Sequence, residues 1–279
     1  MRFNPRLIIA VVIALAGALT YFSSRSTNEI TGENQSVALS PDQEVALGLQ
    51  AQPEMAQQFG GEVNHQINDY VEAVGQRLVR ETVAGRTPYK FDFHVLADPK
   101  TVNAFALPGG QISVTLGMLA ELKSEAELSA VLGHEIGHVV GRHGAEQLSK
   151  QQLSQALVGA VGVATYDGSM GSQQNAAIAA AVAQLVQMRF GRQDELQSDS
   201  IGVFFMKAAN YDPRGMESLM AVLAKAGGGG GGRQPEFFST HPSPENRIQR
   251  INALIAQAGT GGETAEDRYQ RNVLAFLRR

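Results

Sequence analysis

Two histidines and a glutamate in one short segment have the types and spacing needed for metal-dependent hydrolysis. His134, Glu135 and His138 follow the pattern His-Glu-x-x-His, in which one helix face supplies two zinc ligands and a general base. Successive helical residues rotate by about 100°, so positions four apart lie within roughly 40° of each other. Both imidazoles can therefore reach one ion, while Glu135 projects to the side, where it can hold a water molecule.

The motif leaves a zinc site short of a third protein ligand. A catalytic zinc takes three protein ligands and keeps one position open. The chain has no Cys, so zinc sites that contain Cys are excluded. The remaining donors are a carboxylate or another histidine, namely His65, His94, His143 or His241. His143 follows the motif closely, but it comes one residue too early for the metzincin spacing.

The stronger candidate is Glu195, in a segment that we predict to be a helix from about 176 to 210. Glu195 and Asp199 are four residues apart and therefore share one helix face. One carboxylate can then bind the metal while the other accepts the free N–H of a ligand histidine. A solvated acidic helix face is the alternative interpretation of this pair.

A buried helix is expected to carry the His-Glu-x-x-His motif. Ser124 to Glu127 form a capping box, in which the serine accepts a backbone N–H and the glutamate reaches back. Apolar residues then recur at three- and four-residue spacing as far as Val140. Gly133 and Gly137 each cost about 1 kcal/mol relative to Ala in a helix. Their presence indicates close approach of a backbone or substrate, or tight helix packing.

Two alternating segments, 91–96 and 111–116, are predicted to be strands of a small sheet beside this helix. The fold class is therefore α+β and mainly helical. An extended peptide could add to an edge of such a sheet through main-chain hydrogen bonds. Asn103, Ala104 and Phe105, which lie between the two strands in sequence, are the candidate substrate-binding residues. A plain structural hairpin is the alternative.

These motifs together resemble the M48 metallopeptidases, the group of bacterial periplasmic proteases and mitochondrial Oma1-like enzymes. The likeness includes the zinc-binding motif, the Glu-x-x-x-Asp segment at Glu195, and three further segments at 103–110, 211–216 and 240–247. It covers roughly residues 40 to 255, and no tetratricopeptide repeat follows. The resemblance implies a zincin-like (gluzincin) domain.

The resemblance also implies roles for individual residues. His134, His138 and Glu195 would bind one Zn²⁺ per chain, and Asp199 would support a ligand histidine. Zinc lowers the pKa of a coordinated water molecule to about 7, and Glu135 would accept its proton. His241 matches a histidine that stabilises the oxyanion or, in some members of the family, occludes the metal.

The sequence therefore predicts a zinc-dependent endopeptidase that acts on misfolded or envelope proteins, a substrate class supplied by the resemblance alone. A non-proteolytic chaperone or assembly factor that uses the same cleft to bind polypeptide is the alternative. The net charge of −4 gives no basic patch, which argues against a nucleic-acid partner. The oligomeric state is not specified by any pattern.

The N-terminus carries an uncharged run of 16 residues, Leu7 to Phe22, preceded by Arg2 and Arg6. A full span takes about 20 apolar residues, so this run is a short signal anchor or a signal peptide. We expect a retained anchor, with a single pass through the inner membrane and the catalytic domain on the periplasmic side. Cleavage would instead leave a soluble periplasmic protein.

The predicted organisation is a segment at 1–22, a polar linker at 23–39, the peptidase domain at 40–258 and a C-terminal tail helix at 259–279. Residues 151–188 are expected to form a helical hairpin over the cleft, with a membrane-dipping hairpin as the alternative. The six glycines at 227–232 predict a flexible surface loop.

Overall fold

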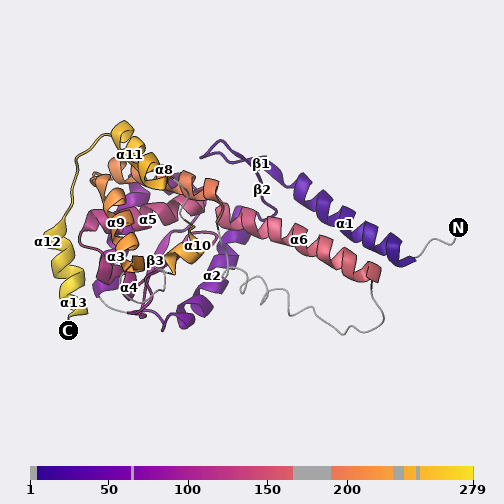
Figure 1. Ribbon diagram of the computed structural model, residues 1–279, viewed down its shortest axis with the longest axis horizontal. Helices are drawn as coiled ribbons and strands as arrows, with labels where there is room; N and C mark the ends of the chain where they lie inside the picture. Colours follow the sequence, from indigo (N-terminus) through magenta and orange to yellow (C-terminus); the bar gives the residue numbers. More distant parts are fainter. Residues whose placement is uncertain (1–4, 64–65, 166–189, 229–235, 243–245, 279) are drawn as a thin grey trace. The chain divides into compact units, whose positions relative to one another are not determined.

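The computed structural model describes residues 5–63, 66–165, 190–228, 236–242 and 246–278 of the chain (Figure 1). The chain divides into two compact units. Unit 1 consists of 1–40 and 144–188, and unit 2 consists of 41–143 and 189–279. Unit 2 contains all of the predicted site residues, so most of the description concerns it.

The described residues of unit 1 form two helices and a short hairpin. It contains α1 (Pro5–Ser23), β1 (Arg25–Thr27), β2 (Asn34–Ser36) and most of α6 (His143–Thr165). A Cβ added at Gly17 of α1 would lie 2.5 Å from Ala156 Cβ of α6, so the glycine allows these helices to touch. The predicted linker thus contains two paired antiparallel strands. None of the described helices is both long and apolar enough to cross a membrane.

Unit 2 is mainly helical with a small sheet, as the sequence predicts. Its elements before residue 144 are α2 (Pro41–Gln58), α3 (Gln66–Arg80), η1 (Val83–Arg86), β3 (Asp92–Leu96), β4 (Ala104–Ala106), β5 (Gln111–Thr115), α4 (Leu116–Glu121) and α5 (Glu125–Val140). Those that follow are α8 (Arg192–Ala208), α9 (Arg214–Gly228), α10 (Phe237–Thr240), α11 (Arg247–Ala258), α12 (Glu266–Tyr269), η2 (Gln270–Leu274) and α13 (Ala275–Leu277).

The sheet has the order β3-β5-β4. The two predicted strands, β3 and β5, pair in parallel, and β4 returns antiparallel to β5. Gly109 has a φ of 83° in the turn between β4 and β5, and a Cβ there would lie 2.3 Å from Val45 Cα. Because β4 pairs with one strand only among the described residues, it forms an edge of the sheet.

Every residue of α5, from Glu125 to Val140, is buried, which confirms the prediction of a buried helix. The Ser124 hydroxyl accepts the N–H of Glu127 as expected. The Glu127 carboxylate accepts the N–H of Lys123 and also interacts with the backbone N–H of Ser124. A Cβ on Gly137 would lie 3.0 Å from Ser198 Cα of α8. Tight packing of α5 on α8 is therefore the reason for a glycine at this position.

The helix that carries Glu195 is shorter at its start than predicted. Phe190 and Gly191 are not helical, and α8 begins at Arg192. The Gly191 N–H donates to the Asp194 carboxylate at 2.8 Å, and this cap stabilises the helix start. The expected continuous helix through 190 and 191 is therefore wrong. Residues 166–189, including the second half of the predicted hairpin, lie outside the described residues.

The C-terminal segment packs on unit 2 through α12, η2 and α13. Tyr269 and Val273 are fully buried, and the Tyr269 hydroxyl donates to the Leu119 carbonyl at 2.6 Å. Arg268 binds the buried carboxylate of Glu125 at 2.9 and 3.0 Å, and Glu263 accepts from Arg77 at 3.2 Å. These contacts attach the C-terminal segment to α3, to α4 and to the first turn of α5.

Candidate active site

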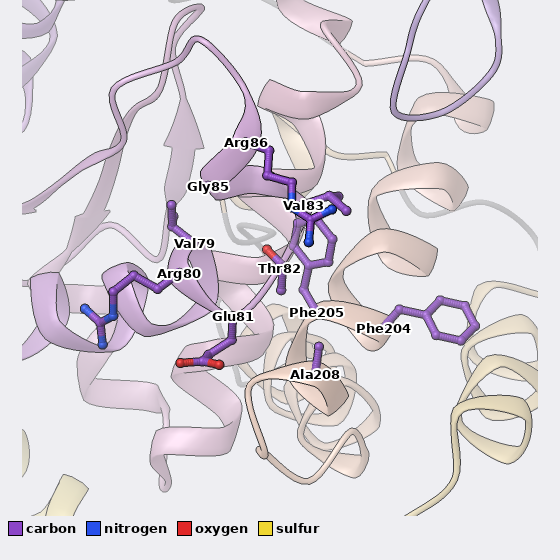
Figure 2. A pocket seen from close by; sticks show the side chains of 10 residues that line it. All are labelled: Val79, Arg80, Glu81, Thr82, Val83, Gly85, Arg86, Phe204, Phe205 and Ala208. Carbon is purple, nitrogen blue, oxygen red and sulfur yellow. The ribbon is translucent and has the colours of Figure 1, made fainter.

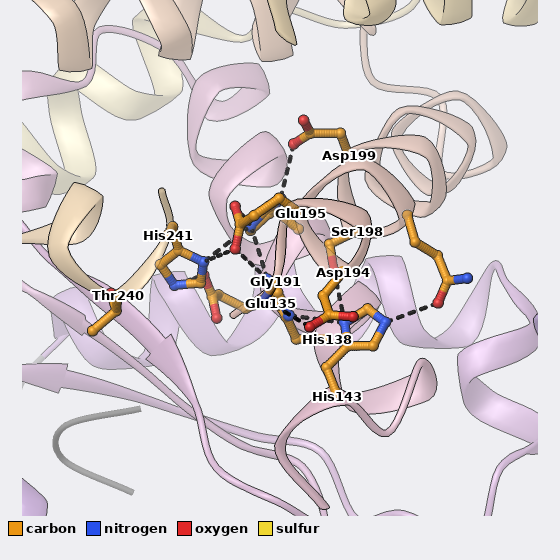
Figure 3. Close-up of polar contacts among 12 residues, drawn as sticks. Glu135, His138, His143, Gly191, Asp194, Glu195, Ser198, Asp199, Thr240 and His241 are labelled. Atoms are coloured by element: carbon orange, nitrogen blue, oxygen red, sulfur yellow. Dashed lines mark hydrogen bonds and ion pairs between the residues drawn. The ribbon is translucent and has the colours of Figure 1, made fainter. Parts of the chain in front are cut away.

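Two helices bring the three predicted metal ligands together. His134 and His138 come from α5, and Glu195 comes from the first turn of α8. Figure 3 shows His138 and Glu195 at this site. The two Nε2 atoms lie 3.1 Å apart, and each lies 3.5 Å from an oxygen of the Glu195 carboxylate. All three side chains are at most 2% exposed. The structure thus brings together residues that are far apart in the sequence.

His241 joins this group from the end of α10. Its Nδ1 lies 3.0 Å from Glu195 Oε1 and 3.3 Å from His134 Nε2. One donor atom from each of His134, His138, Glu195 and His241 lies within 4.8 Å of the others. The Phe237 ring stacks on the His241 ring with centroids 4.4 Å apart, which fixes its position. In this arrangement His241 lies among the metal donors.

Glu135 is completely buried beside the cluster. Neither carboxylate oxygen has a hydrogen-bond partner among the described residues, and Oε1 lies 3.5 Å from His241 Nε2. Burial raises the pKa of Glu135, although the positive charges of His241 and His134 and the backbone of Ala106 oppose the shift. A carboxylate with a raised pKa and free oxygens is suited to proton transfer near neutral pH.

Asp199 supports His134 from behind. Its Oδ1 lies 2.9 Å from His134 Nδ1, so the Nδ1–H bond points to the carboxylate and the Nε2 lone pair faces the cluster. Burial raises the pKa of Asp199, but His134 and Arg247 outweigh this effect and hold it below its usual value.

Arg247 of α11 also belongs to this site, although the sequence patterns included it only in the segment 240–247 and assigned it no role. It is 2% exposed, and it donates to the two Asp199 oxygens at 2.7 and 2.8 Å. Its Nη1 lies 3.3 Å from Glu195 Oε2. The sequence shows a basic residue at position 247, three residues after Pro244. Its burial against two carboxylates, however, depends on the packing of α11 on α8.

The chemistry of the donors fits a metal cation. Two imidazole nitrogens and a carboxylate are common zinc ligands, and Glu195 Oε2 has no hydrogen-bond partner among the described residues. The environment also favours positive charge. Burial opposes protonation of His134, yet Asp199 and Glu195 raise its pKa to about 9.

The other histidines considered from the sequence have different surroundings. His94 lies in β3, where its Nε2 is 2.9 Å from Gln111 Oε1, and it is not part of the cluster. His143 is buried and contacts Nδ1 of the donor residue His138, but it is not itself one of the four donor residues. His65 lies outside the described residues.

The candidate substrate strand is largely covered. Asn103 is 2% exposed and Phe105 8%, while Ala104 has no exposed surface. Phe237 of α10 donates its N–H to the Val102 carbonyl at 3.2 Å, just before the strand. Thr115 donates to the Asn103 carbonyl, and Leu107 to that of Gln111. The ladder alternates, so the backbone groups of Ala104 and Ala106 face away from β5.

A surface pocket of about 860 Å³ lies elsewhere on unit 2 (Figure 2). It is formed by the end of α3, by η1 and by the second half of α8, where Phe204 and Phe205 contribute to the lining. None of the four donor residues lines it. The pocket is therefore separate from the candidate active site.

A His-Glu-x-x-His helix joined by a carboxylate from a later helix is the arrangement of a metallopeptidase. Residues 65–255 match the profile of peptidase family M48. The chain belongs to this family, and it is a metalloendopeptidase, a hydrolase of peptide bonds.

Similar proteins occur in mitochondria and in bacteria. The mitochondrial metalloendopeptidase OMA1 of Schizosaccharomyces pombe is 31% identical over 271 residues, which cover 94% of this chain and 77% of that protein. OMA1 of Arabidopsis thaliana is 38% identical over 157 residues, 56% of this chain and 29% of that protein. The beta-barrel assembly-enhancing protease of Escherichia coli is 32% identical over 189 residues, 65% of this chain and 37% of that protein.

Proposed function

We propose that the protein is a zinc-dependent endopeptidase in which His134, His138 and Glu195 hold the metal and Glu135 is the general base. The observation that carries this proposal is the placement of a fully buried carboxylate with free oxygens, Glu135, beside the donor cluster. A burial of this kind is costly unless the group has a use or a partner. A binding module would have no need of such a carboxylate.

The residues of the chain would divide the reaction between them. When bound, zinc would polarise the scissile carbonyl and lower the pKa of a water molecule to about 7. Glu135 would take the proton of the attacking water and later give it to the leaving amine. Asp199 would hold the His134 ring so that its Nε2 stays directed at the cluster, 3.1 Å from His138 Nε2.

His241 has a second assignment that follows from its position. The family resemblance implies that it stabilises the oxyanion or occludes the metal, and its Nδ1 lies 3.0 Å from Glu195 Oε1, among the candidate metal donors. We propose that it occupies the position needed by substrate at rest and withdraws with α10 when polypeptide binds. At rest its Nε2 lies 3.5 Å from Glu135 Oε1. After His241 has left the metal donors, this nitrogen would donate a hydrogen bond to the carbonyl oxygen of the bound substrate.

Polypeptide would bind as an extended strand along the edge at β4. The backbone groups of Ala104 and Ala106 face away from β5, and they would pair with an extended peptide once α10 no longer bonds to Val102 and the Ala106 backbone no longer contacts Glu135. Such pairing recognises the peptide backbone and depends little on the side chains. It therefore suits misfolded proteins, which share an extended backbone and no common sequence. The name of the Escherichia coli relative connects that protein with β-barrel assembly, and this supports envelope proteins as a substrate class here.

We also propose that the apolar N-terminal segment directs the chain to the cell envelope, with the peptidase unit on the periplasmic side. The exposed apolar side chains of α1, among them Leu7, Leu15 and Leu19, support contact with lipid. Carbonate extraction of membranes, together with the N-terminal sequence of the mature protein, distinguishes an anchor from a cleaved signal peptide.

A casein digest with matched variants tests the proposed mechanism. Glu135→Gln should keep stoichiometric zinc and lose about 10²–10⁴-fold in cleavage rate, whereas His134→Ala should lose the zinc. His94→Gln, a histidine of the sheet outside the cluster, serves as the control and should keep both. Cleavage by Glu135→Gln at the wild-type rate would refute the role of the base. A folded, zinc-loaded wild type that prevents aggregation without cleaving would favour the chaperone.

A further inference from the structure

A third histidine, His143, contacts a ligand histidine from the side opposite the cluster (Figure 3). Its Nδ1 lies 2.9 Å from His138 Nδ1, and its Nε2 lies 2.8 Å from the side-chain oxygen of Gln197 on α8. Ser198 Oγ lies 3.3 Å from the same Nδ1. His143 is 2% exposed, so these contacts form in an interior where unpaired polar atoms are costly.

The proton positions on the two histidines follow from the atom at the end of this row of hydrogen bonds, the side-chain oxygen of Gln197. An amide oxygen only accepts hydrogen bonds, so the Nε2 of His143 must donate to Gln197. A neutral imidazole carries one N–H, and His143 Nδ1 is therefore an acceptor. The hydrogen between the two Nδ1 atoms then belongs to His138. This leaves His138 Nε2 with a free lone pair, 3.5 Å from Glu195 Oε1.

We propose that Gln197 and His143 form a relay that fixes the metal-binding tautomer of His138. The proposal rests on the proposed function of the cluster as a zinc site. Both residues are positioning residues, because they act on the metal only through His138. Asp199 does the same for His134 through a single hydrogen bond of 2.9 Å, so each ligand histidine has its own partner.

The backbone before His143 is adapted to this contact. A Cβ added at Gly141 would lie 2.4 Å from His143 Nε2 and 2.7 Å from its Cε1. Any side chain at 141 would push the ring away from Gln197. Phe190 stacks on the His138 ring with centroids 3.9 Å apart, which restricts rotation of the ligand. The distances in the relay are therefore set by packing as well as by hydrogen bonds.

Substitutions at Gln197 can preserve or reverse the relay without removing either histidine. Gln197→Glu keeps an acceptor opposite His143 Nε2 and should leave zinc affinity unchanged or tighter. Gln197→Lys offers only donors, so His143 must donate from Nδ1 and His138 must place its proton on Nε2, towards the metal. Loss of a supporting partner typically weakens metal binding by about 10–100-fold, and we expect a loss in this range. Gln193→Lys adds the same charge to an exposed position of α8 and serves as the control.

The test consists of two measurements. Chelator competition gives the zinc affinity, and NMR of the metal-free protein gives the chemical shifts of the histidine ring nitrogens. We expect His138 to carry its proton on Nδ1 in the wild type and in Gln197→Glu, and on Nε2 in Gln197→Lys. An Nε2 proton on His138 in the wild type, or equal zinc affinity of Gln197→Lys and Gln193→Lys, would overturn the relay. A wild type with the expected tautomer and affinity but no cleavage of casein would refute the peptidase mechanism and leave the relay intact.

Discussion

Replacement of Arg247 by methionine should destabilise the metal-free protein strongly. The guanidinium is the buried partner of two carboxylates, with hydrogen bonds of 2.7 and 2.8 Å to Asp199 and a contact of 3.3 Å to Glu195. Methionine keeps much of the apolar stem and removes the charge. Loss of one partner of a buried ion pair costs about 3–5 kcal/mol, because the remaining charge is left uncompensated. At about 2–4 °C per kcal/mol for a domain of this size, the melting temperature should fall by roughly 6–20 °C.

Denaturant unfolding in the presence of a chelator measures this loss directly. Arg250→Met, an exposed arginine of the same helix, is the matched control and should change stability by no more than about 0.5 kcal/mol. The double variant Asp199→Asn with Arg247→Met should lose less than the sum of the single variants, because the two residues interact. If Arg247→Met unfolds at the same denaturant concentration as Arg250→Met, the buried ion pair does not stabilise α8 against α11.

Three further outcomes follow from the structure. Gly137→Ala should cost about 1–3 kcal/mol in unfolding free energy, because its Cβ would lie 3.0 Å from Ser198 Cα; a more stable variant would contradict the tight α5–α8 packing. Arg268 and Arg77 hold the pKa of Glu263 below its usual value, so this carboxylate stabilises the fold above about pH 4.5 and the effect is lost as the pH falls through the lowered pKa. Glu263→Gln should therefore weaken the fold in urea at neutral pH and have little effect at pH about 3, and an equal loss at both would exclude this linkage. Removal of metal with EDTA should lower the melting temperature, and zinc should restore it; identical melting curves would contradict a cation at the donor cluster.

The sequence predicted the elements whose signals are local. Ser124 as a cap and the apolar spacing after it located α5, and the alternation at 91–96 and 111–116 located β3 and β5. Four-residue spacing placed Glu195 and Asp199 on one helix face, and the structure brings this face to the histidines of α5. In each case the physical rule depends only on neighbouring residues.

The features that were not predicted depend on contacts between distant segments. Nothing around Arg247 in the sequence indicates that α11 packs on α8 and buries the guanidinium against Asp199. The role of His143 depends on Gln197, which is 54 residues away. The late start of α8 at Arg192 was missed because the cap is formed by Gly191 with Asp194, a weaker signal than a serine or threonine cap. The hydrogen bond from Phe237 of α10 to Val102, just before β4, likewise depends on tertiary packing.

Under the proposed binding of polypeptide along β4, the hydrogen bond from Phe237 to Val102 makes the enzyme's own chain a competitor of its substrates at the start of that strand edge. A ligand that binds only the open form has an affinity reduced in proportion to how seldom that form is populated. A short peptide makes only a few main-chain contacts, which do not offset this reduction in affinity. A long unfolded chain makes many such contacts and can offset it. Discrimination by length, with folded proteins and small fragments spared, would thus arise without any pocket that recognises a particular side chain.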